Sequence, residues 1–93
     1  MTTKKDIVRR IAKKLKLPQV DTKRVVQSTL DTIVEVLATE GRLELRDFGV
    51  FQVKQRAARR ARNPKTNQEV MVPPRKVVTF KPGKVLEQTI RNL

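Results

Sequence analysis

The sequence contains no cysteine, histidine, tryptophan or tyrosine, and these absences exclude several kinds of site. Without cysteine the chain has no disulfide, no thiol nucleophile and no zinc–thiolate centre. Without histidine it lacks the usual general base at neutral pH and the commonest metal ligand. Because small secreted domains normally depend on disulfides, we expect a reducing compartment, the cytoplasm.

Long apolar runs and phosphate-cradling glycine loops are also missing. No apolar stretch approaches the roughly 20 residues that cross a membrane, and none follows Met1 as a signal peptide requires. The nine acidic residues are scattered along the chain. We therefore expect no enzyme activity, no catalytic residue, no metal, no cofactor and no membrane partner.

Positive charge is what the chain has in excess. The 22 lysines and arginines outnumber the 9 aspartates and glutamates, which gives a net charge of +13 over 93 residues. Such a balance destabilises a compact state by self-repulsion unless a polyanion neutralises it. The hydrophobic share, 38%, lies below the usual range of about 45–50%, so a single domain this short is expected to complete its core against a second copy.

An amphipathic helix is predicted over residues 3–16. Thr3 followed by Asp6 indicates a capping box at its start. Apolar residues from Ile7 to Leu15 recur at helical spacing and form one stripe, whereas lysines and arginines cover the remaining surface. For most of these lysines the simplest interpretation is a solvated face.

A second helix is predicted over residues 19–39, after a break at Pro18. Its apolar residues include a seam spaced 4-3-4, as in coiled coils, and extend well beyond that seam. A helix with so broad an apolar arc needs partners on two sides, and we expect one of them to be another subunit. The alternative is a helix wrapped wholly by its own chain. The seam consists of Val26, Leu30, Ile33 and Leu37.

Strands and a protruding arm are predicted for the second half of the chain. Alternating or β-branched residues indicate strands at 42–46, from 50 onward and at 76–80. The segment 55–75 holds six basic residues, one acid and mostly small apolar side chains, so it cannot form a core. A two-stranded ribbon with its tip at residues 63–67 fits this segment, with limbs that reach roughly 30 Å.

The excess charge is concentrated in this half. Residues 48–86 carry 10 basic side chains and 1 acidic one, whereas residues 1–47 carry 11 and 7. An arm with charge of a single sign is typical of a nucleic-acid partner. Arginine predominates on it, and arginine suits phosphates and narrow grooves.

The three aromatic residues, all phenylalanine, are too few and too apolar in their setting to form a base-stacking platform. We expect Phe48, Phe51 and Phe80 to pack in the core instead. Pro64, at the predicted tip of the arm, has two interpretations. It either simply makes the turn or acts as a rigid wedge that enters between base pairs and kinks a duplex.

Four segments together resemble the HU/IHF family of bacterial DNA-bending proteins. They are Phe48-Gly49-Val50-Phe51, Arg56-Ala57-Ala58-Arg59, Arg62-Asn63-Pro64-Lys65-Thr66 and Phe80-Lys81-Pro82-Gly83-Lys84. Their order and spacing fit the family over nearly the whole chain without a gap.

The resemblance implies one α+β domain over residues 1–93, in an intertwined dimer. Residues 1–40 would form a helical base. Residues 42–81 would form a three-stranded antiparallel sheet and a β-ribbon arm, and residues 84–93 a C-terminal helix. The dimer would bind duplex DNA through the minor groove and bend it by inserting Pro64. It would compact chromosomal DNA in the nucleoid with low sequence specificity.

The resemblance also implies which residues act. Those expected to contact DNA are Lys4, Lys54, Arg56, Arg59, Arg60, Arg62, Asn63, Pro64, Lys65, Arg75, Lys76, Lys81 and Lys84. Those expected in the core or dimer interface are Val26, Leu30, Ile33, Leu37, Phe48, Phe51 and Phe80.

Several residues depart from the family pattern. Asp47, Ala61 and Asn67 stand where the family usually has glycine, and an acid at position 47 argues against a backbone contact with DNA there. Pro18 replaces a hydroxyl N-cap, and Pro74 adds rigidity at the base of the arm.

Two other functions stay open at this point. The stretch Val77-Val78-Thr79-Phe80 is similar to the IHF branch, whose members are sequence-specific benders that work as heterodimers, so a paralogous partner is an alternative to a homodimer. From a different class, a small basic RNA-binding or ribosomal protein is compatible with the composition.

Overall fold

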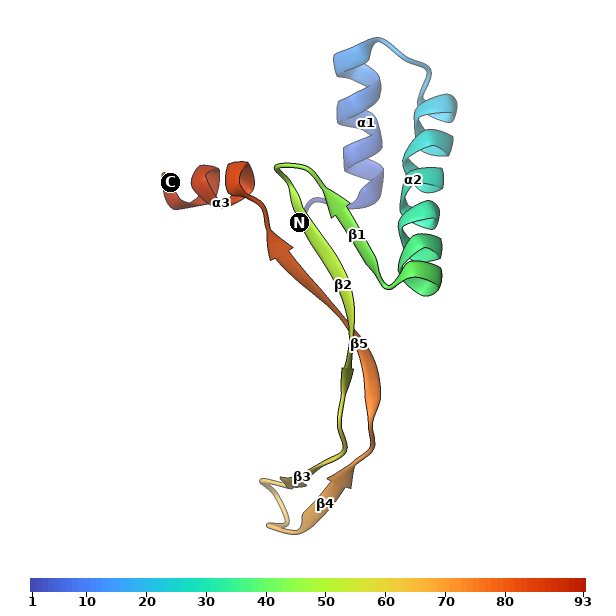
Figure 1. The fold of residues 1–93 in the computed structure, drawn as a ribbon. Coiled ribbons are helices and arrows are strands. Elements are labelled where there is room, and N and C mark those ends of the chain that lie inside the picture. Colours follow the sequence, from blue (N-terminus) through green and yellow to red (C-terminus); the bar gives the residue numbers. More distant parts are fainter. The chain divides into compact units, whose positions relative to one another are not determined.

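The computed structural model describes residues 1–93 and contains three helices and five strands (Figure 1). The chain divides into two compact units, residues 1–36 and residues 37–93, which are described in turn. No helix in it is both long enough and apolar enough to cross a membrane.

Helix α1 (Lys4–Leu15) begins at the predicted capping box. The Thr3 backbone N–H and its hydroxyl both donate to Asp6 Oδ2, at 2.9 and 3.0 Å. These hydrogen bonds, the backbone one first, hold the pKa of Asp6 below its usual value. The helix ends at Lys16, which adopts left-handed φ of 55°. The predicted helix over residues 3–16 is confirmed, with its end residues serving as the caps.

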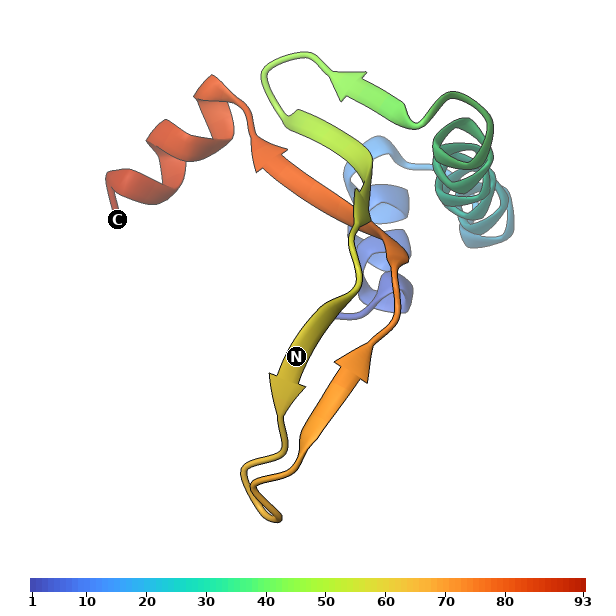
Figure 2. The ribbon, with the colours of Figure 1, turned by 60° about the horizontal axis from the view of Figure 1, so that its bottom comes forward.

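Helix α2 (Gln19–Glu40) lies beside α1 in both views of the ribbon (Figures 1 and 2). Its first turn is fixed by the Pro18 carbonyl, which accepts hydrogen bonds from the Thr22 N–H at 3.1 Å and the Thr22 hydroxyl at 2.9 Å. Gly41, with φ of 75°, follows the last helical residue. The prediction of residues 19–39 is confirmed to within one residue.

The first unit has very little core. Its buried apolar side chains are Val8 and Ala12, with 6% and 4% of their surface exposed. Between α1 and α2 runs a groove that is mostly apolar, lined in part by Ile7, Leu15 and Leu30. Of the predicted seam in this unit, Val26 and Ile33 are half-buried and Leu30 is 42% exposed. Leu37, the last residue of the seam, belongs to the second unit and is buried. Within this unit, α1 therefore leaves much of the seam uncovered.

The second unit contains a three-stranded antiparallel sheet in the order β1-β2-β5. Its strands are β1 (Arg42–Leu45), β2 (Gly49–Arg56) and β5 (Arg75–Pro82). The three predicted strands are confirmed, with the last two longer than expected. Because side chains alternate along a strand, the register determines which residues share each face.

One face of this sheet is apolar and carries the predicted phenylalanine cluster. Phe51 pairs with Phe80 across β2 and β5, with ring centroids 4.7 Å apart, and Phe48 lies 5.7 Å from Phe80. A Cβ at Gly49 would lie 2.5 Å from the Phe80 ring, so only glycine fits there. The rings pack together as predicted, but Phe48 and Phe80 stay 49% and 40% exposed.

The arm continues from the sheet. Strands β2 and β5 run on past β1, and beyond them β3 (Arg59–Arg62) pairs antiparallel with β4 (Glu69–Val72) (Figure 2). The pairing is interrupted at Ala57-Ala58 on one limb and at Pro73-Pro74 on the other. Proline has no N–H to donate to a ladder, which accounts for the second interruption. The predicted ribbon is confirmed.

Helix α3 (Lys84–Arg91) is joined to the turn between β1 and β2. Gly83, its N-cap, has no side chain to satisfy the first N–H groups of the helix. The Phe48 carbonyl accepts from the Gly83 N–H at 2.7 Å, and the Asp47 carbonyl accepts from the Leu86 N–H at 3.4 Å. Asp47 has φ of 65°, a left-handed conformation that glycine adopts more readily than residues with a Cβ.

Candidate nucleic-acid interface

The tip of the arm is a closed turn that presents Pro64. The Asn67 N–H donates to the Asn63 carbonyl at 2.7 Å, and the Lys65 N–H donates to Asn63 Oδ1 at 2.9 Å. Asn67 has φ of 60°, so asparagine supplies the left-handed residue that glycine usually provides. Pro64 is exposed at the turn, and with no N–H it leaves no donor unsatisfied.

The arginines of the arm divide between its two faces. By register, Arg59 lies opposite Val72 and shares its face with the apolar pair Ala61 and Val70. The residues of the other face are Arg60, Arg62, Glu69 and Met71. The single acid of the arm lies opposite Arg62 and forms an exposed ion pair with Arg60, at 3.9 Å between Arg60 Nη1 and Glu69 Oε2.

Two arginines face each other where the arm leaves the sheet. Arg56 and Arg75 are direct partners in the β2–β5 ladder, and both are exposed. Like charges directly opposite each other on a sheet are destabilising. Neither of the two ion pairs in the structure involves either residue. An anionic ligand such as a phosphate would relieve this repulsion.

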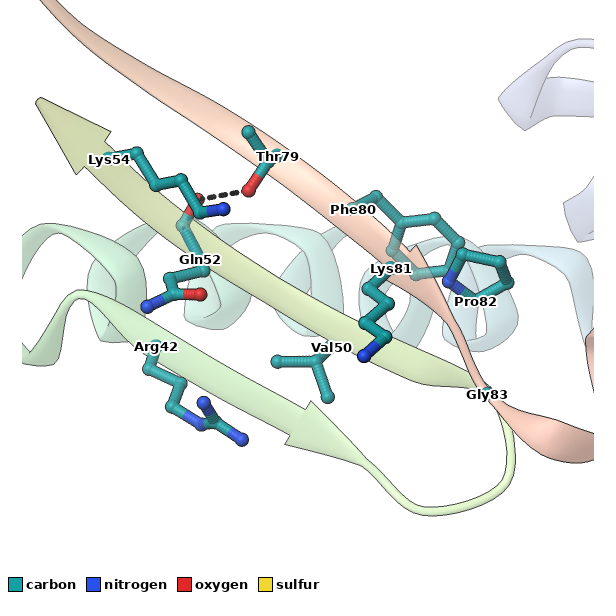
Figure 3. Close-up of a pocket in the computed structure, with 9 residues that line it drawn as sticks. All are labelled: Arg42, Val50, Gln52, Lys54, Thr79, Phe80, Lys81, Pro82 and Gly83. Atoms are coloured by element: carbon teal, nitrogen blue, oxygen red, sulfur yellow. Dashed lines mark hydrogen bonds between the residues drawn. The ribbon is translucent and has the colours of Figure 1, made fainter. Parts of the chain in front are cut away.

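The polar face of the sheet carries a further group of cations (Figure 3). Arg42, Lys54 and Lys81, one from each strand, extend over a shallow hollow on the same side of the sheet, and no carboxylate lines it. The Thr79 hydroxyl, in the same hollow, donates to the Gln52 carbonyl at 3.2 Å. This surface is positive, concave and continuous along the strands with Arg56 and Arg75.

Sequence reasoning identified Lys54 and Lys81 in this group but missed Arg42 and Gln52. Arg42 and Gln52 are direct partners in the β1–β2 ladder. Residue alternation along β1 was visible in the sequence, but it does not say which β2 residue lies opposite. The pairing of the strands supplies that information.

Three other predicted contact residues lie elsewhere. Lys76 pairs with Gln55 on the face that carries the phenylalanines, opposite to Lys54 and Lys81. Lys84 is the first residue of α3. Lys4 belongs to the first unit, where its ammonium donates to Gln27 Oε1.

This arrangement defines a class of protein: a β-ribbon DNA-binding protein, with a cationic two-stranded arm on a small sheet. The family model for "Bacterial DNA-binding protein" matches residues 2–91, and the chain belongs to this family, which includes HU and integration host factor. It is thus an architectural DNA-binding protein, as the sequence motifs predicted.

Relatives from both branches match almost the whole chain. DNA-binding protein HU of Thermotoga maritima is 39% identical over 96% of this chain and 99% of its own length. Integration host factor subunit alpha of Hydrogenovibrio crunogenus is 38% identical over 97% of this chain and 93% of its own length. Such similar identities do not separate the two branches.

A solved structure of HU bound to DNA has the same fold. The Anabaena HU–DNA cocrystal structure matches with a TM-score of 0.86 and 30% identity, over 96% of this chain and 97% of that one. The α+β fold with a three-stranded antiparallel sheet and a β-hairpin, expected from the resemblance, is therefore confirmed.

Proposed function

We propose that two copies of this chain form a homodimer that clasps duplex DNA between its arms and bends it. The arms enter the minor groove, where Arg56, Arg59 and Arg62 meet sugar–phosphate edges. Pro64 inserts between base pairs and unstacks them, which kinks the duplex. Binding has low sequence specificity and occurs on chromosomal DNA in the nucleoid.

The observation that carries this proposal is an arm with unpaired cations and an exposed proline at its tip. The facing pair Arg56 and Arg75 has no carboxylate partner, and the hollow of Arg42, Lys54 and Lys81 continues the same positive surface. Phosphates satisfy all these groups without reading base identity. The rigid turn around Pro64 places an apolar ring at the end of the arm, where a wedge needs to be.

The exposed apolar groove of the first unit supports a dimer. Large apolar side chains that remain exposed there include Leu15 at 58%, Val25 at 66% and Leu30 at 42%. A monomer would leave this contiguous surface in water, at about 25 cal/mol for each Å² of apolar area. A second copy of the same chain covers it with an equivalent surface.

A salt titration tests the phosphate-based binding. If a dimer neutralises roughly 6–10 phosphates, log affinity falls against log salt with a slope of about −5 to −9. Linear duplexes of unrelated sequence are compared by gel shift across salt concentrations, and their affinities are expected to agree. A nearly flat salt response contradicts the proposal.

The variant Pro64→Ala tests the wedge separately. Removing the ring should reduce the bend angle, measured by single-molecule imaging, while leaving much of the affinity, because the phosphate contacts remain. Lys65→Ala is the matched control, since it changes the neighbouring tip residue and keeps the proline. Bend angles that Pro64→Ala leaves unchanged contradict the wedge.

Sequence-specific bending is the second candidate. It is supported by the stretch Val77-Val78-Thr79-Phe80, which resembles the IHF branch, and an integration host factor subunit is about as similar to the chain as an HU is. Competition between random and selected duplexes separates the two candidates, because only a specific bender prefers the selected sequence by a large factor.

A further inference from the structure

A second basic surface lies on α1, in the first compact unit. Residues 4–16 contain 7 basic residues and 1 acid, whereas residues 17–47 contain 4 basic residues and 6 acids. The positive charge of the N-terminal half is thus concentrated on one helix. The arm and sheet described above do not use it.

The geometry of α1 gathers four of these cations on one side. Val8 and Ala12 are buried, and Ile7, Ile11 and Leu15 line the apolar groove, so together they mark the inward side of the helix. At 3.6 residues per turn Arg9, Arg10 and Lys13 lie on the opposite side together with Asp6, and Lys14 lies at its edge beside Ile7. We call these four cations, all exposed, the α1 basic face.

None of these four cations forms an ion pair, although Arg9 lies near enough to Asp6 for its charge to contribute to the lowered pKa of that carboxyl. The ion pairs of the structure are Arg60–Glu69 and Arg91–Glu87, and neither involves α1. The single acid of α1, Asp6, accepts hydrogen bonds from Thr3 at the helix start.

The spacing of the four cations also makes them repel one another. Arg9 and Lys13, like Arg10 and Lys14, are four residues apart, and like charges at that spacing destabilise a helix by about 0.2–0.5 kcal/mol for each pair. A polyanion would remove this repulsion, as at Arg56 and Arg75.

Duplex DNA fits this face better than a membrane does. The basic residues from Arg9 to Lys14 span roughly 8 Å of helix axis, and a duplex of that length carries about four phosphate charges. A helix that lies on a membrane needs a free apolar side with aromatic anchors. The apolar side of α1 lines the groove that it shares with α2, which a second copy covers in the proposed dimer, and the helix contains no aromatic residue.

We propose that the α1 basic face is a second DNA-phosphate-binding surface, which acts without the arm and holds a further stretch of duplex. It goes beyond the function proposed for the arm and sheet. Because the contacts are to phosphates, it has no sequence preference. One protein with two such surfaces can extend its hold on a duplex or link two duplexes.

The test compares two fourfold variants of the full chain. Arg9→Gln/Arg10→Gln/Lys13→Gln/Lys14→Gln removes the charge. Arg9→Lys/Arg10→Lys/Lys13→Arg/Lys14→Arg keeps it and serves as the matched control. Glutamine, lysine and arginine have similar helix propensities, so circular dichroism should show α1 intact in both.

The first readout is binding to a long linear duplex. Each lost phosphate contact reduces the magnitude of the log–log salt slope by about 0.9, so this slope should be smaller by about 2–4 per chain in the charge-removing variant. The affinity of that variant at low salt should fall at least about tenfold. The charge-keeping variant should stay within about threefold of the parent, because phosphate binding depends mainly on charge.

The second readout is capture of a free labelled duplex by a duplex fixed to beads. Loss of capture with unchanged affinity for one short duplex indicates that the α1 basic face holds a second DNA molecule. Loss of both indicates that it holds more of the same duplex. Either outcome supports the surface.

Equal slopes and equal capture for the two fourfold variants overturn the inference. So does charge-dependent binding of the α1 face to phosphatidylserine vesicles with duplex binding unchanged. The bend angle distinguishes this test from the Pro64→Ala test of the wedge. Neither fourfold variant should alter a kink made by Pro64. If Pro64→Ala leaves bending unchanged while the α1 effect persists, only the wedge fails.

Discussion

The helical pair α1–α2 and the arm each expose a surface of a kind that folded proteins normally cover or neutralise. The two surfaces are opposite in chemical character. Between the helices the uncovered groups are apolar, with Leu15 58% and Val25 66% exposed. On the arm they are charged, with Arg56 facing Arg75. We infer that a second copy of the chain covers the apolar surface and that a polyanion neutralises the charged one.

The comparison shows that stability and binding trade off differently in the two regions. In the proposed homodimer, covering the groove would add to the free energy of folding, so folding and association there would be a single process. Repulsion along the arm lowers stability in the free protein, and the ligand removes it on binding. A substitution should therefore act in the same direction on both properties in the groove and in opposite directions on the arm.

Leu30→Asp should have the largest effect. Leu30 is 42% exposed in the single chain, where a surface substitution would change stability by only about 0.5 kcal/mol. In a dimer the carboxylate is buried without a partner, which costs on the order of 3–5 kcal/mol. We expect loss of the dimer in analytical ultracentrifugation and a much lower melting temperature.

The matched control for this prediction is Ser28→Asp, an exposed position on the same helix that does not line the groove. It introduces the same charge and should leave the dimer intact. A Leu30→Asp protein with the sedimentation and melting temperature of Ser28→Asp would show that the groove is not an interface.

Arg56→Gln should have an intermediate effect, of opposite sign on the two properties. Removing one of two facing like charges should raise the free energy of unfolding by about 0.2–1 kcal/mol. Losing a phosphate contact should lower DNA affinity by roughly three- to tenfold and reduce the salt slope by about 0.9 per chain. Chemical denaturation and gel shift measure the two properties on one preparation.

Arg91→Gln is the control for Arg56→Gln, because its guanidinium already pairs with Glu87 at 2.8 Å. That exposed pair contributes about 0.3–0.5 kcal/mol, so stability should fall slightly while DNA affinity stays the same. If Arg56→Gln also lowers stability, Arg56 stabilises the folded protein. The proposed difference between the arm and the groove would then be wrong.

Local patterns predicted most of the elements. Thr3 and Asp6 predicted the start of α1, and Pro18 predicted the break after that helix. The turn-forming residues around Pro64 predicted the tip of the arm. Each of these signals lies within a few residues of chain, so its physical cause is visible in the sequence. Asn67 in the left-handed conformation belongs to the same group.

The division of cations between faces could not be predicted. It depends on register, and a shift of one residue would move every side chain to the other face. The pairing of Arg56 with Arg75, the place of Arg42 and the apolar-face position of Lys76 all follow from the ladder. The interpretation of the α1 lysines as a solvated face agrees with their exposure, and the structure adds that none of them forms an ion pair.

Asp47→Gly should have the smallest effect, and it tests how much the sheet contributes beside the arm. Asp47 has φ of 65°, and relief of this conformation is worth about 1 kcal/mol. Glycine also gives the unfolded chain more conformational freedom, which lowers the free energy of unfolding by about 0.4–1 kcal/mol. The two effects on stability therefore nearly cancel. Thermal unfolding should therefore change little, whereas DNA affinity should rise a few-fold because a negative charge near the positive sheet is gone.

Asp47→Asn separates charge from backbone in this prediction. Asparagine tolerates the left-handed conformation about as well as aspartate and carries no charge, so its affinity should match that of Asp47→Gly at unchanged stability. The carbonyl at this position accepts from the Leu86 N–H in every variant, so α3 should stay capped. If both variants bind DNA as the parent does, the turn lies outside the contact surface and the sheet acts only through the cations of its strands.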